Sequence, residues 1–480
     1  MHTATRVAAI IDGAHATDDA YEVTDPNDGS VIAVVDDCGT EAAALAAESA
    51  AVASTSWRTT TIDTRREVLR VAADHLAARE SELIELAIAD TGSRRSVAGD
   101  MQVRAAIERL RAWADAPADL LDLQSPHPSG RVSARVRRQP VGVVACISPY
   151  NFPLLAMVAK VAPALFSGNA VIMKPAPQDP LLVGHLAEGL AAGLRTVRAD
   201  TGVVSFVPGA SPAPGQELVE HPAVGAVSFT GSTAVGTEIY RSAAPHMKRL
   251  LLELGGKGAL IVRADTSLDA VLPAVTRAWT YHAGQVCLTP SRILVHSSRY
   301  AEVVAALKDV LKQLRHGDPR DTATDVAPII TAAQRHRIGG MVERAREAGM
   351  DVHQSAGVPG GGFHYPATLV SNARPDAEIM REEVFGPVIS VMAVDSDDHA
   401  VEVANATRYG LYDYVFSADR AAAERLAGRL ESAQVGINTI RRHPGAPFGG
   451  NKMSGIGRTG GTYALDTYTD LQALVSEDPE

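Results

Sequence analysis

The sequence predicts an α/β fold built on parallel sheets, and three observations support this prediction. Between residues 141 and 208, short apolar segments alternate with helical patterns, as buried strands do in a doubly wound parallel sheet. A second alternation of the same kind begins near Leu254. At roughly 100–200 residues per domain, the 480 residues of the chain provide for two to four domains.

The first elements are two short strands and a helix. Residues 21–35 predict the strands, which the turn-forming residues 25–29 separate. The helix has one apolar face, formed by Leu69, Ala72, Ala73 and Leu76. We expect Asp63 or Thr64 to cap this helix, with Glu67 completing a capping box if Thr64 is the N-cap.

Residues 131–137 alternate between apolar and polar types, which predicts a strand with two different faces that projects from the body. Its arginines Arg135, Arg137 and Arg138 form the one basic cluster of a chain whose net charge is −11. We interpret them as the solvated face of the strand, and we expect no nucleic-acid partner. Because an exposed strand associates unless it is paired, we predict a homodimer or homotetramer.

The two α/β segments follow, element by element. In the first, strands are predicted at residues 141–147, 170–173, 203–207 and 226–229, and helices at residues 154–165 and 181–194. In the second, strands are predicted at residues 260–262, 292–295 and 388–394, and helices at residues 301–314 and 333–348. The tail from Thr462 alternates weakly and ends in the acidic residues 477–480, which we expect to fray.

The cysteines and the hydropathy pattern bear on location. Three cysteines, Cys38, Cys146 and Cys287, give no disulfide framework and are typical of a reducing compartment. The N-terminus opens no long apolar segment of a signal peptide, and no apolar run reaches the roughly 18 residues that a membrane span needs. We therefore expect a cytoplasmic protein without a membrane partner.

Cys287 is the first candidate for chemistry. It follows a turn that contains Gly284, where the missing side chain leaves room for a ligand to approach the thiol. A cysteine acts as a nucleophile in its thiolate form, so such a site must also lower the thiol pKa. The alternative is a buried structural cysteine, which is the commoner role of a lone free cysteine.

Two further polar residues stand beside glycine-rich or rigid segments. Glu253 precedes a glycine pair, and it could reach into a cleft as a general base or form an ordinary salt bridge. Asn151 lies between Pro149 and Pro153 at the end of an apolar strand. Its amide could donate a hydrogen to a developing oxyanion, or bond to its own backbone in a turn.

Residues 229–236 form a fourth candidate. They run from a strand through Gly231 and small hydroxyl residues into a helix, and free N–H groups at such a helix start favour an anion. The G-x-G-x-x-G spacing of dinucleotide-binding turns is absent, so this segment alone is weak evidence for a dinucleotide.

Together, these segments resemble the aldehyde dehydrogenase superfamily over nearly the whole chain. The matching stretches stand in the family's order: SPYNFPL (148–154), KPAPQDP (174–180), FTGSTAVG (229–236), LELGGK (252–257), GQVC (284–287), EEVFGPV (382–388) and PFGGNKMSGIGR (447–458). The resemblance implies a Rossmann-type cofactor domain, an α/β catalytic domain and a β oligomerisation arm. It assigns the cofactor domain to 1–118 and 140–252, the catalytic domain to 253–445, and the arm with the C-terminal region to 119–139 and 446–480.

The resemblance implies oxidation of an aldehyde to a carboxylic acid. Cys287 would attack the carbonyl and form a thiohemiacetal, whose oxyanion Asn151 and the Cys287 N–H would stabilise by roughly 2.7–4 kcal/mol per donor. Loss of hydride to the nicotinamide gives a thioester, and Glu253 would activate the water that hydrolyses it. Lys160 would assist proton movement, or serve as a buried structural lysine.

Two rival functions are disfavoured by the same residues. Relatives that pass the acyl group to coenzyme A lack a glutamate at this position, so Glu253 favours release of the free acid over acyl transfer. A non-catalytic scaffold would need neither Cys287 nor Asn151, and the intact set therefore favours an enzyme.

The resemblance also implies a nicotinamide dinucleotide, and no metal site is expected. The implied contacts are Lys174 at the adenosine ribose, Gly231 and Ser232 at the pyrophosphate, Glu383 at the nicotinamide ribose and Phe385 near the ring, together with Ser148 and Gly255. Pro177 stands where many NAD-preferring relatives carry a glutamate that bonds the ribose hydroxyls and repels a 2′-phosphate. We expect NAD as the cofactor, with NADP as the alternative.

Two features have no settled role in the sequence. His282 stands where the family commonly has asparagine. Arg441, Arg442 and His443 precede the loop that lines the family's substrate entrance. A cationic entrance would favour an aldehyde that bears a carboxylate, because arginine binds carboxylates through two hydrogen bonds. The alternative is a basic run that faces solvent or another subunit.

Overall fold

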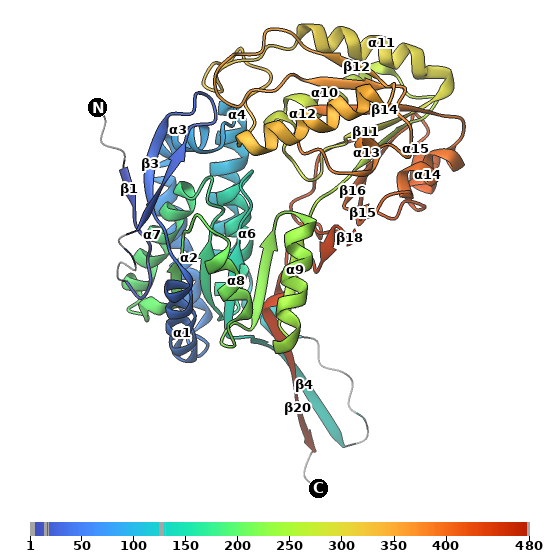
Figure 1. Ribbon diagram of the computed structural model, residues 1–480. Coiled ribbons are helices and arrows are strands. Elements are labelled where there is room, and N and C mark those ends of the chain that lie inside the picture. The colour runs from blue at the N-terminus through green and yellow to red at the C-terminus, as the bar shows by residue number, and fades with distance from the viewer. Residues whose placement is uncertain (1–4, 14–16, 18, 124–128, 130, 478–480) are drawn as a thin grey trace.

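The computed structural model describes residues 5–13, 17, 19–123, 129 and 131–477, and it contains two α/β bodies and an arm (Figure 1). Each body is built on its own sheet with helices on both faces, and the arm projects from the first body. The α/β class predicted from the sequence is confirmed. Among the described residues, no helix has the length and apolar character that a bilayer crossing requires.

The first body is built on a six-stranded sheet in the order β19-β9-β8-β5-β6-β7. Its five parallel strands are β5 (Val143–Ile147), β6 (Ala170–Lys174), β7 (Val204–Phe206), β8 (Ala226–Thr230) and β9 (Arg249–Glu253). The short β19 (Gly455–Ile456) pairs antiparallel with β9. The order runs outward from β5 in both directions, and such a switch point leaves a crevice beyond the carboxyl ends of β5 and β8.

Helices cover both faces of this sheet, and most of the chain between residues 40 and 114 is helical. They are α1 (Thr40–Trp57), α2 (Ile62–Ala77), α3 (Glu80–Thr91), α4 (Arg95–Val97), α5 (Ala105–Ala114), α6 (Pro153–Phe166), α7 (Leu181–Thr196), α8 (Ala213–Glu220), α9 (Thr233–Ala243) and α16 (Leu465–Tyr468). Two hydrophobic cores lie against the two faces of the sheet, one around Phe166 and the other around Phe229.

The predicted cap of α2 is wrong. The N-cap is Thr61, whose hydroxyl oxygen accepts a hydrogen bond from the Thr64 backbone N–H at 3.2 Å. Thr61, Asp63 and Thr64 are all residue types that cap helices. The extended backbone at Thr61 selects among them, and that conformation is not visible in the residue types.

A smaller sheet precedes α1. It contains β1 (Thr5–Val7), β2 (Ala20–Thr24) and β3 (Val31–Asp36) in the order β1-β3-β2. The two strands predicted within residues 21–35 are therefore confirmed. Asp25 makes the turn between them, because its side chain accepts from Asn27 N at 2.8 Å and its carbonyl accepts from Gly29 N at 2.8 Å.

The second body is built on a seven-stranded sheet in the order β12-β13-β14-β11-β10-β16-β17. Its strands are β10 (Ala259–Val262), β11 (Arg292–His296), β12 (Asp351–Gln354), β13 (Thr368–Ser371), β14 (Val388–Val394), β16 (Tyr412–Phe416) and β17 (Gln434–Ile437). Its helices are α10 (Leu268–Thr280), α11 (Ser297–Gln313), α12 (Ala332–Glu347), α13 (Glu378–Arg381), α14 (Asp397–Asn405) and α15 (Arg420–Ala427). The strands and helices predicted between residues 141 and 394 are confirmed, with bounds shifted by a few residues.

Short strands join the C-terminal region to the second body. β15 (Tyr409–Gly410) pairs antiparallel with β18 (Asn451–Lys452). Since β19 joins the first sheet, residues 451–456 connect both bodies.

The arm is a two-stranded antiparallel ribbon of β4 (Val132–Pro140) and β20 (Thr469–Glu477). It projects away from both bodies in Figure 1. The strand predicted at residues 131–137 is confirmed. Residues 124–128 and 130, which precede it, and residues 478–480 of the acidic tail lie outside the described residues.

Candidate active site

A cavity of about 1180 Å³ lies between the two bodies, beyond the carboxyl ends of β5, β6 and β8. This is the crevice that the switch point of the first sheet creates. The residues that line it include all those the sequence predicted as catalytic or cofactor-binding: Ser148, Asn151, Lys160, Lys174, Gly231, Ser232, Glu253, Gly255, Cys287, Glu383 and Phe385. The fold therefore brings the predicted site residues together at one place.

Cys287 follows a backbone turn that few sequences can adopt. The φ angles of His282, Ala283 and Gly284 are 51°, 50° and 70°, so three successive residues are left-handed. Each non-glycine residue in this conformation costs about 1–3 kcal/mol. A Cβ at Gly284 would overlap the Gly386 carbonyl. The turn must be held by contacts from outside it.

Gln285 is one of the residues that hold the turn. Its side-chain amide nitrogen donates to the carbonyls of His282 and Pro328, at 3.1 and 3.3 Å, and its side-chain oxygen accepts from the Ile330 N–H at 2.9 Å. Its backbone carbonyl accepts from Asn151 Nδ2 at 2.8 Å. The loop that carries Cys287 therefore also orients the Asn151 amide.

The backbone of Asn151 is fixed from two further sides. Its carbonyl accepts hydrogen bonds from Gln102 Nε2 at 2.8 Å and from His282 Nε2 at 2.9 Å. Gln102 belongs to η1 (Ala98–Arg104), a π-helix between α4 and α5. Such helices are rare and are frequent at functional sites. These contacts give His282, which the sequence left without a role, a place in the support of Asn151.

His282 is neutral at physiological pH because burial lowers its pKa to about 4. In the unfolded chain the imidazole titrates near pH 6.5. The unfolded state therefore binds more protons as the pH falls from about 6.5 to about 4, and the folded state loses about 3 kcal/mol of stability over this window.

We expect His282→Asn to remove this acid-dependent loss, since asparagine does not titrate. Acidification from pH 7 to pH 4 should lower the Tm of the wild-type protein more than that of the variant. The comparison of Tm against pH for the two proteins checks this, because all other titrating groups are shared. Parallel curves would contradict it.

Glu253 ends β9 and is 4% exposed. Burial raises the pKa of its carboxyl group, and the Cys287 thiol and the charges of Lys160 and Arg442 oppose this rise. Within the described part of the chain, its Oε1 has no hydrogen-bond partner. A buried carboxylate with one free oxygen at a cavity is suited to take a proton from a reactant.

The Cys287 thiol faces this carboxylate. Burial, and next the negative charge of Glu253, raise the pKa of the thiol well above its usual range. The thiol is therefore protonated in the resting protein, and Glu253 is positioned to accept its proton. From the sequence alone, a reactive cysteine was expected to have a lowered thiol pKa. In the resting protein the thiol pKa of Cys287 is instead raised.

Lys160 belongs to α6, and its charge acts on the same carboxylate. Its Nζ donates to Thr230 Oγ1 at 2.8 Å and to Ser228 Oγ at 3.4 Å. Burial lowers its pKa to about 8, and the Cys146 and Glu253 groups act against this shift. The lysine therefore has a structural contact with β8 and a pKa close to neutral, and both of its predicted roles remain compatible with its position.

The cavity wall formed by the first sheet is suited to phosphate and ribose. Ser232 caps α9, accepting from the Val235 N–H at 3.3 Å, so the helix start faces the cavity. Lys174 Nζ donates to the carbonyls of Pro175 and Gly209, at 3.0 and 3.4 Å. Ser148 Oγ is buried and has no hydrogen-bond partner among the described residues.

The opposite wall holds Glu383 and Phe385. Glu383 Oε1 accepts from the Gly256 N–H at 2.9 Å, and burial raises the pKa of this carboxyl group to about 7. A Cβ at Gly255 would lie 2.5 Å from Glu383 Oε2, so the glycine permits this approach. Phe385 contacts the Tyr150 ring edge-on, with the ring centroids 5.8 Å apart.

The structure adds Arg109, which the sequence did not indicate, to the predicted Arg442. Both line the cavity. Burial, and next the positive charge of Arg442, lower the pKa of Arg109 to about 10. Arg442 packs over the Phe448 ring at 4.0 Å, and its Nε and Nη2 have no hydrogen-bond partner among the described residues. Arg441 also lines the cavity, whereas His443 does not.

Comparisons with known proteins identify relatives of the whole chain. The model of the aldehyde dehydrogenase family matches residues 14–474. The 2-hydroxymuconic semialdehyde dehydrogenase of Pseudomonas sp. (strain CF600) is 35% identical over 468 residues, which cover 95% of each chain. The 2-aminomuconic 6-semialdehyde dehydrogenase of Pseudomonas sp. is 34% identical over 94% of each chain. The solved NAD⁺ complex of an aldehyde dehydrogenase from Bacillus cereus has a TM-score of 0.94 and 31% identity, over 98% of this chain and 96% of that one.

Proposed function

Because the chain belongs to the aldehyde dehydrogenase family, an NAD-dependent family of oxidoreductases, we propose that Cys287, Glu253 and Asn151 oxidise an aldehyde to its carboxylic acid. The observation that carries the assignment of residues is their convergence. A thiol, the carboxylate that faces it and an oriented amide line one cavity, and a base beside a nucleophile is the arrangement that covalent catalysis requires.

The first half of the reaction forms a bond to Cys287. The thiol passes its proton to Glu253, and the sulfur attacks the carbonyl carbon while the π electrons move to oxygen. The Asn151 amide has two hydrogens, and Gln285 takes one of them. The other hydrogen and the Cys287 backbone N–H donate to the oxyanion, at roughly 2.7–4 kcal/mol per donor.

The second half releases the acid. When a nicotinamide dinucleotide is bound, its ring would accept the hydride that leaves the thiohemiacetal carbon, and this carbon would then be held to Cys287 as a thioester. Glu253 must first return to its carboxylate form, and the neutral fraction of Lys160, whose pKa is about 8, is the proposed route for that proton. Glu253 then takes a proton from water, and the water oxygen bonds to the thioester carbon. The carbon–sulfur bond breaks with its electron pair going to the Cys287 sulfur, which takes the proton back from Glu253.

The cavity has groups that suit the dinucleotide on both walls. Lys174 and the start of α9 with Gly231 and Ser232 would hold the ribose and the pyrophosphate. The buried Ser148 hydroxyl, which has no hydrogen-bond partner among the described residues, can donate one hydrogen bond to such a ligand. Glu383 and Phe385, with Gly255 leaving them room, would hold the nicotinamide ribose and ring.

A turnover assay tests this function. We expect reduced nicotinamide to accumulate when the protein is supplied with NAD and an aldehyde, and the same panel with NADP measures the effect of Pro177 on cofactor choice. The panel contains aliphatic, aromatic and carboxylate-bearing aldehydes. Binding of cofactor without turnover of any aldehyde would contradict the proposal.

We further propose that the substrate is an aldehyde that bears a carboxylate. Arg109 and Arg442 both line the cavity, and the positive charge of Arg442 is near enough to lower the pKa of Arg109, so an anion placed between them would relieve their repulsion. Arg442 is also near Cys287 and Glu253, which places this cationic wall beside the reacting atoms. The two Pseudomonas relatives are named for semialdehydes of muconic acids, and such compounds carry an aldehyde and a carboxylate.

Replacing either arginine should change substrate preference. We expect Arg109→Met and Arg442→Met to lower kcat/KM for carboxylate-bearing aldehydes by about 10–100-fold, because a hydrogen bond to a charged group contributes roughly 1.5–3 kcal/mol. The kcat/KM for neutral aldehydes should fall much less. The matched control is Arg111→Met, since Arg111 is an exposed arginine on the same helix as Arg109 and does not line the cavity. Unchanged ratios of kcat/KM between the two substrate classes would refute the proposal.

The arm supports a proposal of self-association. Because residues opposite one another in an antiparallel pair share a face, one face of the ribbon carries apolar residues from both strands, with Arg138 at one end and Glu477 at the other: Leu471, Ala473, Val475, Val132, Ala134 and Val136. Leu471 is 62% exposed and Val475 is 66% exposed. A projecting apolar face of this kind marks an association surface. We propose that the chain forms a homodimer or homotetramer, and that β4 and β20 serve as its oligomerisation arm.

Charges on the apolar face of the arm should dissociate the oligomer. We expect light scattering at micromolar concentration to give the mass of a dimer or tetramer for the wild type, and a smaller mass for Leu471→Asp with Val475→Asp. Ser476→Asp, on the opposite face of the same strand, is the control and should leave the mass unchanged. A monomeric wild type would overturn the proposal.

We also propose a division of the chain into domains and a cellular location. The first sheet and its helices suit a cofactor domain of residues 1–118 and 140–252, and the second suits a catalytic domain of 253–445. The three cysteines are free, which suits the reducing cytoplasm that we propose as the location.

A further inference from the structure

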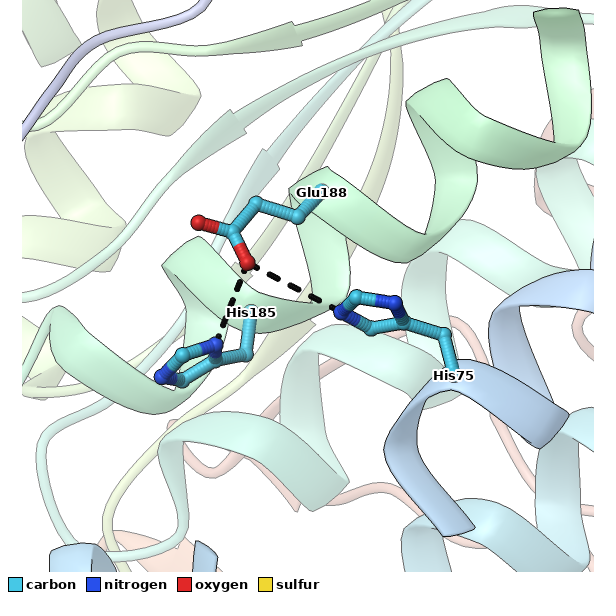
Figure 2. A group of neighbouring side chains, drawn as sticks. All are labelled: His75, His185 and Glu188. Atoms are coloured by element: carbon cyan, nitrogen blue, oxygen red, sulfur yellow. Dashed lines mark hydrogen bonds and ion pairs between the residues drawn. The ribbon is translucent and has the colours of Figure 1, made fainter. Parts of the chain in front are cut away.

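Two imidazole rings and one carboxylate converge where helices α2 and α7 pack together, apart from the residues that line the active-site cavity. His75 comes from α2, and His185 and Glu188 come from α7 (Figure 2). A spacing of three residues places His185 and Glu188 on one face of α7. One ligand atom from each of the three residues lies within 4.8 Å of the other two.

The separations of these atoms resemble those around a zinc ion. Both histidines approach the same oxygen, Glu188 Oε2: His185 Nδ1 lies 3.2 Å from it, and His75 Nε2 lies 3.7 Å from it. Tetrahedral Zn²⁺ with bonds of about 2.0–2.2 Å holds neighbouring ligand atoms roughly 3.3–3.6 Å apart. Two of the three separations are therefore already close to this range, and the third, between the two imidazole nitrogens, is at most 4.8 Å, so side-chain rotations that bring these nitrogens together would complete the coordination geometry.

The backbone beneath the three residues is fixed by close helix packing. A Cβ at Gly189 of α7 would lie 3.2 Å from both Cβ and Cδ2 of His75, and a Cβ at Gly193 would lie 2.8 Å from the Val68 carbonyl oxygen of α2. The two glycines allow α7 to lie directly against α2. A fixed separation of the helices reduces the ordering cost that binding must overcome.

The ring nitrogen of His75 that points into this site is available for a ligand. His75 Nε2 has no hydrogen-bond partner among the described residues, and its contact with Glu188 at 3.7 Å is too long for one.

A cationic side chain already points at this position. Arg79 Nη1 lies 3.2 Å from His185 Nδ1 and 3.4 Å from Glu188 Oε2. The other side of the guanidinium is held by Glu82, through Nε and Nη2 at 3.0 Å each. Arg79 therefore marks where positive charge is favoured, and it can keep its bonds to Glu82 if an ion displaces Nη1.

We propose that His75, His185 and Glu188 form a binding site for a divalent metal ion of the zinc class, which bridges α2 and α7. Two imidazoles and one carboxylate suit Zn²⁺, whereas Mg²⁺ takes oxygen ligands almost exclusively. Glu188 is about half exposed, so water can fill the remaining coordination position. Bound Zn²⁺ stabilises the first body and takes no part in the chemistry at Cys287.

Titration calorimetry of the whole protein with Zn²⁺ tests the proposal. We expect saturable binding by the wild type, a Tm that rises with the logarithm of the Zn²⁺ concentration, and neither effect with Mg²⁺. His185→Ala and Glu188→Gln should each weaken the binding by at least about tenfold, since even the loss of an outer partner of a ligand costs that much. His246→Ala, which removes an exposed histidine elsewhere, is the control and should bind as the wild type does.

Arg79→Gln provides a test in the opposite direction. Removing the competing charge should strengthen Zn²⁺ binding, and a variant that merely unfolds would not do so. Cys287→Ala should retain the binding, which separates this site from the active-site thiol. The proposal is overturned if the wild type shows no saturable binding, if His185→Ala and Glu188→Gln bind Zn²⁺ as tightly as the wild type, or if Arg79→Gln binds more weakly.

Discussion

Cys287→Ala is expected to abolish aldehyde oxidation while leaving the fold and cofactor binding intact. Without the sulfur no covalent intermediate forms, and turnover should fall by on the order of 10⁴–10⁶-fold, the scale of losing the nucleophile in a covalent enzyme. The side chain lies at the cavity surface, where the loss of one sulfur atom leaves the strained turn and its hydrogen bonds in place. The measurement is the rate at which reduced nicotinamide accumulates, with NAD affinity determined separately.

The matched control for this variant is Cys38→Ala. Cys38 is a 1% exposed thiol in a core of the first body, so its loss should lower Tm slightly and leave turnover in place. If Cys287→Ala kept appreciable turnover, another group would have to be the nucleophile. If it lost cofactor binding as well, the lost activity would not identify the thiol as the reacting group.

Glu253→Gln is expected to separate the two halves of the reaction. Glutamine cannot take a proton from water, so steady-state turnover should fall by about 10²–10⁴-fold, the usual contribution of a general base. The rate of the first half of the reaction, which forms the thioester, should fall by a smaller factor. The thiol loses its proton acceptor, but the charge of Glu253 is, after burial, the largest cause that raises the thiol pKa, so removing this charge lowers that pKa and partly compensates for the lost base.

Rapid mixing checks this separation. The variant should give a burst of reduced nicotinamide, followed by slow turnover as the thioester accumulates, and mass spectrometry should find the acyl group on Cys287. A variant that loses the burst and the steady-state rate equally would show that Glu253 is needed before the thioester forms. A variant with unchanged steady-state turnover would remove Glu253 from the role of base.

The pH dependence of the wild-type enzyme follows from the same carboxyl group. As the proposed base, Glu253 would work in its carboxylate form, and burial raises the pKa of this group above the usual value. The steady-state rate should therefore fall on acidification at a higher pH than a solvent-exposed glutamate would impose. In Glu253→Gln this acidic limb should disappear from the profile of the residual rate.

The strands and the motif-bearing residues could be predicted from the sequence because both are local. β5 and β6 are buried along their whole length, and a buried parallel strand reads as a continuous apolar run. Cys287 and Glu253 stand at turns beside glycines, where the chain itself shows that a ligand could approach. The motif order then implied a shared site, and the structure brings those residues to one cavity.

The residues that hold Asn151 in place, and Arg109 in the cavity wall, could not be predicted from the sequence. His282 and Gln102 both bond to the carbonyl of Asn151, although they lie far from it and from each other in the chain. Arg109 sits in the middle of α5 with the pattern of an ordinary amphipathic helix. Nothing in the spacing of these residues indicates which loop or cavity each will face.

The sequence by itself determined the α/β class, the order of the elements and the short motifs that contain the candidate residues for chemistry. Only the tertiary structure decided which residues meet across elements: Arg109 with Arg442, and His75 with His185 and Glu188. The physical reason is that local patterns report the face a residue takes on its own helix or strand. The distance between two such faces depends on how the elements pack, and for α2 and α7 that distance is set by the absence of side chains at Gly189 and Gly193.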